Sequence, residues 1–247
     1  MPFVKLADSD YPKRQSLVVC SWGEEKTHKT FMALTFPKPL HFFNFNYGLS
    51  GVSEAFTGQD ITIWEPPIKL SVMSTEADYE AVYRDFKASY DKSVLLLAKE
   101  AGTVVVDTAT EAAHVIMMGT LAELRRTKYK RLGIDWQPMG LDYGPRNAAV
   151  HSMYTSPMMY PRLNAVFTHM AKDRYGKDDQ GKDVVIGRMI DSHRCATYQT
   201  HIVGENRKKN GVFEFFMQAC RVVPEMDNKV VAPAEYDMLA AICRVTR

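Results

Sequence analysis

The sequence lacks the features that mark secreted, membrane-spanning and disulfide-stabilised proteins. No apolar run approaches the length of a transmembrane helix, and the beginning of the chain has no apolar signal-peptide core. The four cysteines (Cys20, Cys195, Cys220 and Cys243) lie far apart and include no Cys-x-x-Cys pair. Neither a zinc site nor a disulfide framework is indicated, and we expect reduced thiols in a cytoplasmic protein without membrane contact.

A strong excess of one charge is also missing. The net charge of +2 over 247 residues provides no overall attraction to nucleic acid, so such binding would have to come from local patches. Hydrophobic residues make up 46% and charged residues 24%, which are ordinary values for a globular protein. The length suits one large α/β domain.

The most informative segment is Gly23-Glu24-Glu25-Lys26-Thr27-His28-Lys29-Thr30. It follows an apolar run and precedes a helix-like segment, which is the context of the phosphate-binding P-loop pattern G-x-x-x-x-G-K-[ST]. In such a loop, backbone N–H groups and a helix N-terminus bind phosphate oxygens, and the lysine adds a positive charge. We predict that these eight residues bind phosphate. His28 replaces the second glycine, so its imidazole must be accommodated or used.

Alternation of strand-like and helix-like segments predicts an α/β fold with a mostly parallel sheet covered on both faces. Expected strands are 17–21, 40–45, 61–64, 103–107 and 164–168; expected helices are 31–34, 76–100, 108–126, 146–154 and 233–243. Residues 173–183 are so polar that we expect an exposed, mobile loop. Asn210-Gly211 predicts a β-hairpin between strands at 200–204 and 212–218. We expect one domain, 1–247, with an N-terminal extension (1–16), a core (17–170) and a strand-rich C-terminal part (171–247).

Asp107 ends a run of valines and is the carboxylate best placed to serve the loop. A nucleotide-bound Mg²⁺ requires the loop hydroxyl, here Thr30, and a carboxylate from a second strand. We therefore expect Thr30 and Asp107 to organise a metal, with their strands as neighbours in the sheet. The alternative is that Asp107 only caps the helix that begins near residue 108.

Two further residues are catalytic candidates beside Lys29. Glu111 lies one helical turn after Asp107, where it could position or deprotonate a water molecule, or could simply be a solvated acid at a helix start. His169 follows a strand whose carboxyl end is the usual ligand-binding edge of an α/β sheet. It is either a γ-phosphate sensor or an ordinary polar strand end.

Basic residues gather twice, and each cluster has two interpretations. The first surrounds Tyr129 with Trp136 nearby, and the second occupies the expected hairpin tip; their members are Arg125, Arg126, Lys128, Lys130 and Arg131, and Arg207, Lys208 and Lys209. Positive charge beside aromatic rings is typical of single-stranded nucleic-acid binding. Without a ligand, the first cluster would be a solvated helix end and the second a sheet edge protected by charge. The hairpin tip could also reach the nucleotide of a neighbouring subunit.

Taken in order, these segments resemble phage-encoded RecA-like P-loop ATPases, a group that includes single-strand annealing and recombination proteins. The resemblance is carried by the loop and by residues 33–40, 43–48, 104–111 and 166–169. It implies a RecA-like core with Walker A and Walker B motifs, the cofactors ATP and Mg²⁺, and a homo-oligomer on single-stranded DNA. It further implies a role in recombination or replication in the cytoplasm of a bacterial host. Other phage proteins are possible partners.

Two departures from that family bear on hydrolysis. His28 replaces the loop glycine, and Asn44 and Asn46 stand where the family commonly carries an acid. An amide orients water but does not take its proton at neutral pH. A scaffold that binds nucleotide without hydrolysing it is therefore the second hypothesis, and a small-molecule kinase is the third.

Overall fold

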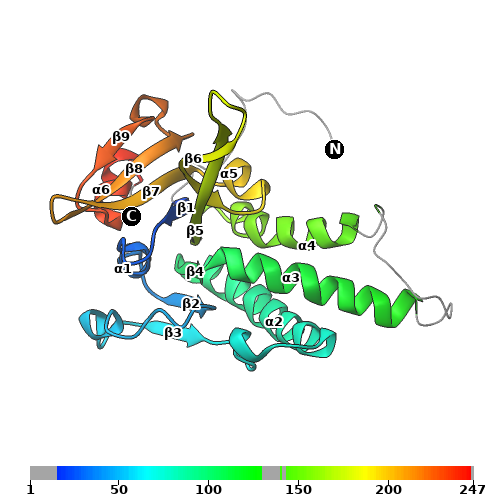
Figure 1. Cartoon of the computed structure of the whole chain (residues 1–247). Coiled ribbons are helices and arrows are strands. Elements are labelled where there is room, and N and C mark those ends of the chain that lie inside the picture. Colours follow the sequence, from blue (N-terminus) through cyan, green and yellow to red (C-terminus); the bar gives the residue numbers. More distant parts are fainter. Residues whose placement is uncertain (1–15, 130–139, 141–142, 246–247) are drawn as a thin grey trace, which may run out of the picture.

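The computed structural model describes residues 16–129, 140 and 143–245. Within them, nine strands form one sheet in the order β3-β2-β4-β5-β1-β7-β8-β9, with β6 paired to β5 (Figure 1). The strands are β1 Val18–Gly23, β2 Leu40–Asn44, β3 Ile61–Trp64, β4 Thr103–Asp107, β5 Asn164–Lys177, β6 Asp183–Asp191, β7 Ile202–Lys209, β8 Val212–Cys220 and β9 Lys229–Val231. The six strands from β3 to β7 are parallel, and the other pairings are antiparallel.

Helices cover both faces of the parallel part, as the sequence predicts. They are α1 Lys29–Leu34, α2 Glu76–Glu100, α3 Ala109–Leu124, α4 Tyr143–Thr155, α5 Cys195–Gln199 and α6 Tyr236–Ile242. Successive side chains of a strand point to opposite faces, so Val104 and Val106 pack in the core with α2, α3 and α4, while Val105 packs in the core with α1 and α6. Burial on both faces explains why these strands are continuous apolar runs.

Most of the predicted elements are confirmed, and the ends of α2 show the local reasons. Thr75 caps the first turn in a reciprocal capping box with Asp78. At the other end Ala101 adopts the left-handed conformation, with φ 55°, before Gly102. The predicted hairpin is also present: Asn210 and Gly211 both have positive φ, 52° and 81°, as a two-residue turn between β7 and β8 requires.

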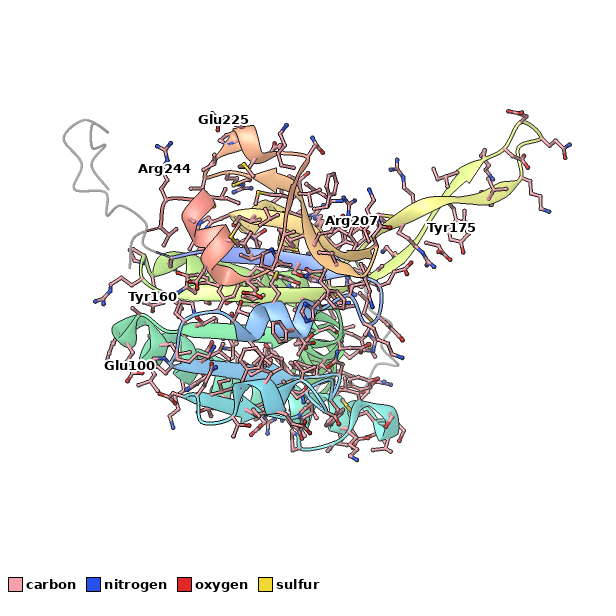
Figure 2. The ribbon with its side chains drawn as sticks, turned by 90° about the vertical axis from the view of Figure 1, so that its left-hand side faces the viewer. Glu100, Tyr160, Tyr175, Arg207, Glu225 and Arg244 are labelled. Carbon is pink, nitrogen blue, oxygen red and sulfur yellow. The ribbon has the colours of Figure 1, made fainter. Side chains whose placement is uncertain are left out.

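One prediction is wrong and a second is wrong in part. The strand of the loop, β1, is not the neighbour of β4, because β5 lies between them and pairs in parallel with both. Sequence order does not determine the spatial order of parallel strands when helical crossovers connect them. Residues 173–183 are largely exposed, as predicted, but only 178–182 form a turn: 173–177 and 183 belong to β5 and β6, an antiparallel ribbon that extends beyond the body of the protein (Figure 2). A polar sequence can form this ribbon, because the backbone hydrogen bonds between the two strands do not require either face of the ribbon to be buried.

Candidate nucleotide-binding site

The loop of residues 23–30 joins β1 to α1 at the carboxyl edge of the sheet (Figure 1). Gly23 has φ 153°, and a Cβ there would lie 2.3 Å from the carbonyl oxygen of Asn206 on β7. Only glycine permits this close approach at the start of the loop. At the end of the loop the Lys29 ammonium donates to the carbonyl oxygens of Gly23, at 2.9 Å, and Glu24. The backbone therefore curls around the lysine side chain, as a phosphate-binding loop does.

Thr30 and Asp107 are brought together as the sequence predicts, although their strands are not adjacent. The Thr30 hydroxyl donates to Asp107 Oδ2 over 2.7 Å, and the Thr168 hydroxyl of β5 donates to Oδ1. Asp107 is fully buried. Burial raises the pKa of Asp107, while the hydrogen bonds from Thr168 and Thr30 and the nearby Lys29 charge oppose that rise.

Asp107 does not act as the helix cap. The Thr108 hydroxyl accepts a hydrogen bond from the Glu111 backbone N–H over 3.3 Å, and Thr108 is the N-cap residue of α3. The plain-cap alternative for Asp107 is therefore wrong, and its carboxylate is available to the loop.

His28 sits in the conformation that a glycine would occupy. Its φ of 74° is left-handed, a region that histidine visits more readily than most residues. The imidazole is stacked between Phe31 of α1, with ring centres 4.2 Å apart, and Phe213 of β8, at 4.0 Å. Burial lowers the pKa of His28, with Glu235 acting in the opposite direction, so the surroundings favour the neutral ring. The substitution is thus accommodated by aromatic stacking.

A cavity of about 890 Å³ opens over the loop. All eight predicted loop residues line it, together with Phe31, Asn46, Gly48, Ser50, Val52, Asp107, Thr108, Met170, Ala171 and Arg188. A volume of this order is typical of small-molecule and cofactor sites. The cavity therefore joins the predicted phosphate loop and the predicted metal ligands in one site.

The other two catalytic candidates lie outside that lining. Glu111 is half-buried in the first turn of α3. His169 is fully buried; its Nδ1 lies 3.3 Å from the Thr110 hydroxyl and its Nε2 lies 3.5 Å from the Tyr154 hydroxyl. Burial lowers the pKa of His169 to about 3, which keeps it neutral. The geometry indicates packing contacts for His169, and its role as a phosphate sensor stays a prediction.

The two asparagines have different positions. Asn46 is exposed and lines the cavity. Asn44 is buried at the end of β2, where its amide donates to Glu65 Oε1 over 2.8 Å and its oxygen accepts from the Gly48 backbone N–H over 3.2 Å. Asn44 thus shapes the turn at residues 45–48, which forms one wall of the cavity.

The described residues of the first basic cluster follow the C-terminal end of α3, which is far in Figure 1 from the tip of the β7–β8 hairpin, where the second cluster lies. Arg125 and Arg126 form ion pairs with Glu76, at 2.5 Å, and Glu80, at 3.0 Å. Lys128 follows in a π-helical turn, while Lys130, Arg131 and Trp136 lie outside the described residues. In the hairpin, Arg207 pairs with Glu214 at 2.5 Å, Lys208 lies over the Phe213 ring, and Lys209 is exposed.

Sequence reasoning missed Thr168, Phe213 and Arg188. Thr168 could have been found, since it is polar at the end of a predicted buried strand beside Asp107. The other two had no recognisable pattern, because only the pairing of the strands places Arg188 of β6 and Phe213 of β8 beside the loop.

No protein-family model and no curated protein matches the chain. Similar solved structures include the RadB recombinase, at 11% identity and a TM-score of 0.44, with 88% of this chain and 86% of that chain covered. Another is the flagellar accessory protein FlaH from Methanocaldococcus jannaschii, at 10% identity and a TM-score of 0.34, with 83% and 77% covered. In the part of the chain that the structure describes, no helix is long and apolar enough to cross a membrane, and no three metal-ligating side chains form a cluster.

Proposed function

We propose that this protein is a RecA-like P-loop ATPase that binds Mg–ATP over residues 23–30. The observation that carries the proposal is the 2.7 Å hydrogen bond between Thr30 and the buried Asp107, directly beside Lys29. A helix-start hydroxyl, a strand-end carboxylate and a loop lysine are the three side chains that a P-loop ATPase requires. The resemblance of the sequence to phage-encoded recombination ATPases supports the same reading.

The residues present fit the metal and the nucleotide. Mg²⁺ prefers oxygen ligands, and the Thr30 hydroxyl and the Asp107 carboxylate are its expected holders, directly or through water. When bound, Mg²⁺ neutralises charge on the β- and γ-phosphates. Lys29 would exchange the carbonyl oxygens of Gly23 and Glu24 for phosphate oxygens. Burial raises the pKa of Asp107, and the hydrogen bonds from Thr168 and Thr30 oppose that rise and so support the ionised form that metal binding needs.

The test is ATP turnover measured with and without Mg²⁺. We expect Mg-dependent hydrolysis in the wild type and its loss in Lys29→Ala and Asp107→Asn. Lys99→Ala and Asp60→Asn remove an exposed lysine and an exposed aspartate away from the cavity, and they serve as matched controls with wild-type turnover. Unchanged turnover in Lys29→Ala would overturn the proposal.

A second candidate is a nucleotide-binding scaffold without hydrolysis. It is favoured by Asn46, an amide on the cavity wall, together with the position of Glu111 outside the lining. Neither residue would take a proton from water at the phosphate. Calorimetric binding of ATP without turnover, either alone or with single-stranded DNA, would select this candidate over the ATPase.

We further propose single-stranded DNA as a partner, bound by a homo-oligomer in recombination or replication. The hairpin tip is the better of the two basic clusters, because Lys208 and Lys209 are exposed there and only Arg207 pairs with a carboxylate, whereas both Arg125 and Arg126 do so. Replacing Arg207, Lys208 and Lys209 by alanine should weaken binding of a labelled oligonucleotide and reduce its salt dependence. Arg125→Ala/Arg126→Ala is the matched control. Binding that does not change between about 50 and 200 mM salt would contradict the proposal.

A further inference from the structure

Arg188 is the only basic residue of the β5–β6 ribbon that lines the cavity, among the residues described. It forms two ion pairs. Its Nε lies 3.2 Å from Glu24 Oε1 of the loop, and its Nη1 lies 2.5 Å from Asp173 Oδ1 on the opposite strand of the ribbon. The same guanidinium therefore holds the loop and the ribbon together.

Glu24 is contacted by two cations, and both of them line the cavity. Its backbone carbonyl accepts from Lys29, and its carboxylate pairs with Arg188. The lysine of a P-loop reaches the β- and γ-phosphates. The Arg188 guanidinium is therefore close to the end of the cavity where the terminal phosphates would lie.

The ion pair with Glu24 is easily exchanged. The side chains of Arg188 and Glu24 are 50% and 60% exposed, so water screens their attraction and the pair is weak. Compared with a carboxylate, a phosphate group offers a guanidinium more acceptor oxygens and more negative charge, and it allows bidentate hydrogen bonding. A triphosphate in the loop would compete successfully with one solvated carboxylate.

We infer that Arg188 exchanges Glu24 for the terminal phosphate of a bound nucleoside triphosphate, and thereby couples the ribbon to the nucleotide state. Asp173 and Arg188 are direct partners in the strand register and form an ion pair, so a shift of the guanidinium would act on the opposite strand as well. The ladder is irregular beside them, between Arg174 and Tyr175, where such an irregularity bends the strand. This inference rests on the proposed nucleotide site and adds a residue and a regulated element to it.

The ribbon is the part of the molecule that such coupling would reposition. Figure 2 shows Tyr175 on the strand pair well away from the body. Tyr175, Val185 and Ile186 are each more than half exposed. A movement of Arg188 would therefore change the position of a strand pair that projects into solvent.

The first test is calorimetric binding of ATPγS and of ADP, each with Mg²⁺. Arg188→Ala should weaken ATPγS binding about tenfold, the scale of one lost charge-assisted hydrogen bond, and should affect ADP clearly less. Glu24→Gln should strengthen ATPγS binding, because the competing carboxylate is gone. Arg174→Ala removes an exposed arginine of the same ribbon outside the cavity lining, and it should match the wild type.

The second test is hydrogen exchange of residues 172–189 at saturating nucleotide. ATPγS should change the protection of these amides in the wild type, and the change should be absent in Arg188→Ala at equal occupancy. If Arg188→Ala matches the wild type in both measurements, or loses ADP and ATPγS affinity equally, the inference is overturned while the nucleotide site stands. If the wild type binds neither nucleotide, the proposed function fails, and this inference fails with it.

Discussion

Two antiparallel strand pairs contact the loop of residues 23–30, and they do so by different physical means. The β7–β8 hairpin places Phe213 against the His28 ring, 4.0 Å away, whereas the β5–β6 ribbon places Arg188 beside the Glu24 carboxylate. Stacking of neutral rings is insensitive to salt and needs one fixed geometry. An exposed ion pair is weak, is screened by salt and can be replaced by another anion. The hairpin is therefore suited to hold the loop, and the ribbon to respond to what the loop binds.

The two strand pairs also differ in how deeply their side chains are buried. Phe215 of β8 is fully buried in the core beneath α1 and α6, while the outer part of the ribbon is exposed on both faces. We expect Phe215→Ala to lower the free energy of unfolding by about 3–5 kcal/mol, as for other buried phenylalanines. Val185→Ala, at a position 54% exposed, should change it by less than about 0.5 kcal/mol. Urea denaturation of both variants checks the contrast, and similar losses would show that the ribbon is packed in solution.

His169, in the buried part of β5, should make the stability of the protein depend on pH. Its pKa is lowered from 6.5 to about 3 by burial, so below pH 6.5 the unfolded chain binds a proton that the folded chain does not. Stability contributed by the neutral ring is fully present above pH 6.5 and is lost progressively as the pH falls towards 3. Between pH 7.5 and pH 5 this loss is about 2 kcal/mol.

Denaturation curves at several pH values, compared between the wild type and His169→Asn, isolate that contribution. The variant is less stable at pH 7.5 but should lose less stability on acidification. Asp107 acts in the opposite sense, because its pKa is raised and its protonation favours the folded state. Equal pH slopes in the two proteins would contradict the burial of a neutral His169.

The stacked contact of the hairpin should give a measurable coupling energy. A double-mutant cycle with His28→Ala and Phe213→Ala is expected to yield about 1 kcal/mol, the scale of one aromatic pair. The value should be the same at about 0.1 M and about 1 M salt, because neutral rings are not screened. A coupling that disappears in high salt would mean that His28 is charged.

His28→Gly tests the same contact from the side of the loop. Glycine adopts the φ of 74° without strain, so the loop should keep its path and its affinity for nucleotide, while the stacking is lost. Nucleotide titration should give a change much smaller than that of Lys29→Ala. A loss as large as that of Lys29→Ala would show that the imidazole contacts phosphate.

The ionic contact of the ribbon should give the smallest effect on stability. A cycle with Glu24→Gln and Arg188→Ala, measured without nucleotide, is expected to yield about 0.2–1 kcal/mol at low salt and close to zero at about 1 M. A larger and salt-independent coupling would mean that the pair is held too firmly to exchange with phosphate, and the contrast between the two strand pairs would no longer hold.

Secondary structure was predicted correctly from the sequence wherever the residues of one short segment are enough to determine it. The apolar strand 103–107 and the Asn210-Gly211 turn need no distant partner to be recognised. The prediction of a loop over all of 173–183 missed the strand residues 173–177 and 183 for the opposite reason. Those residues bury little side-chain surface, and what orders them is backbone pairing with a strand whose position the local pattern does not reveal.

The sequence alone predicted the loop between a strand and a helix at residues 23–30, the pairing of Thr30 with Asp107 and the α/β class, because each follows from residue types at fixed spacing. Only the tertiary structure decided what surrounds the loop: β5 between β1 and β4, Phe213 on the His28 ring and Arg188 beside Glu24. Those contacts join residues up to 185 positions apart, from His28 to Phe213. Sheet order and hairpin pairing create such contacts, and no spacing within a single segment records them.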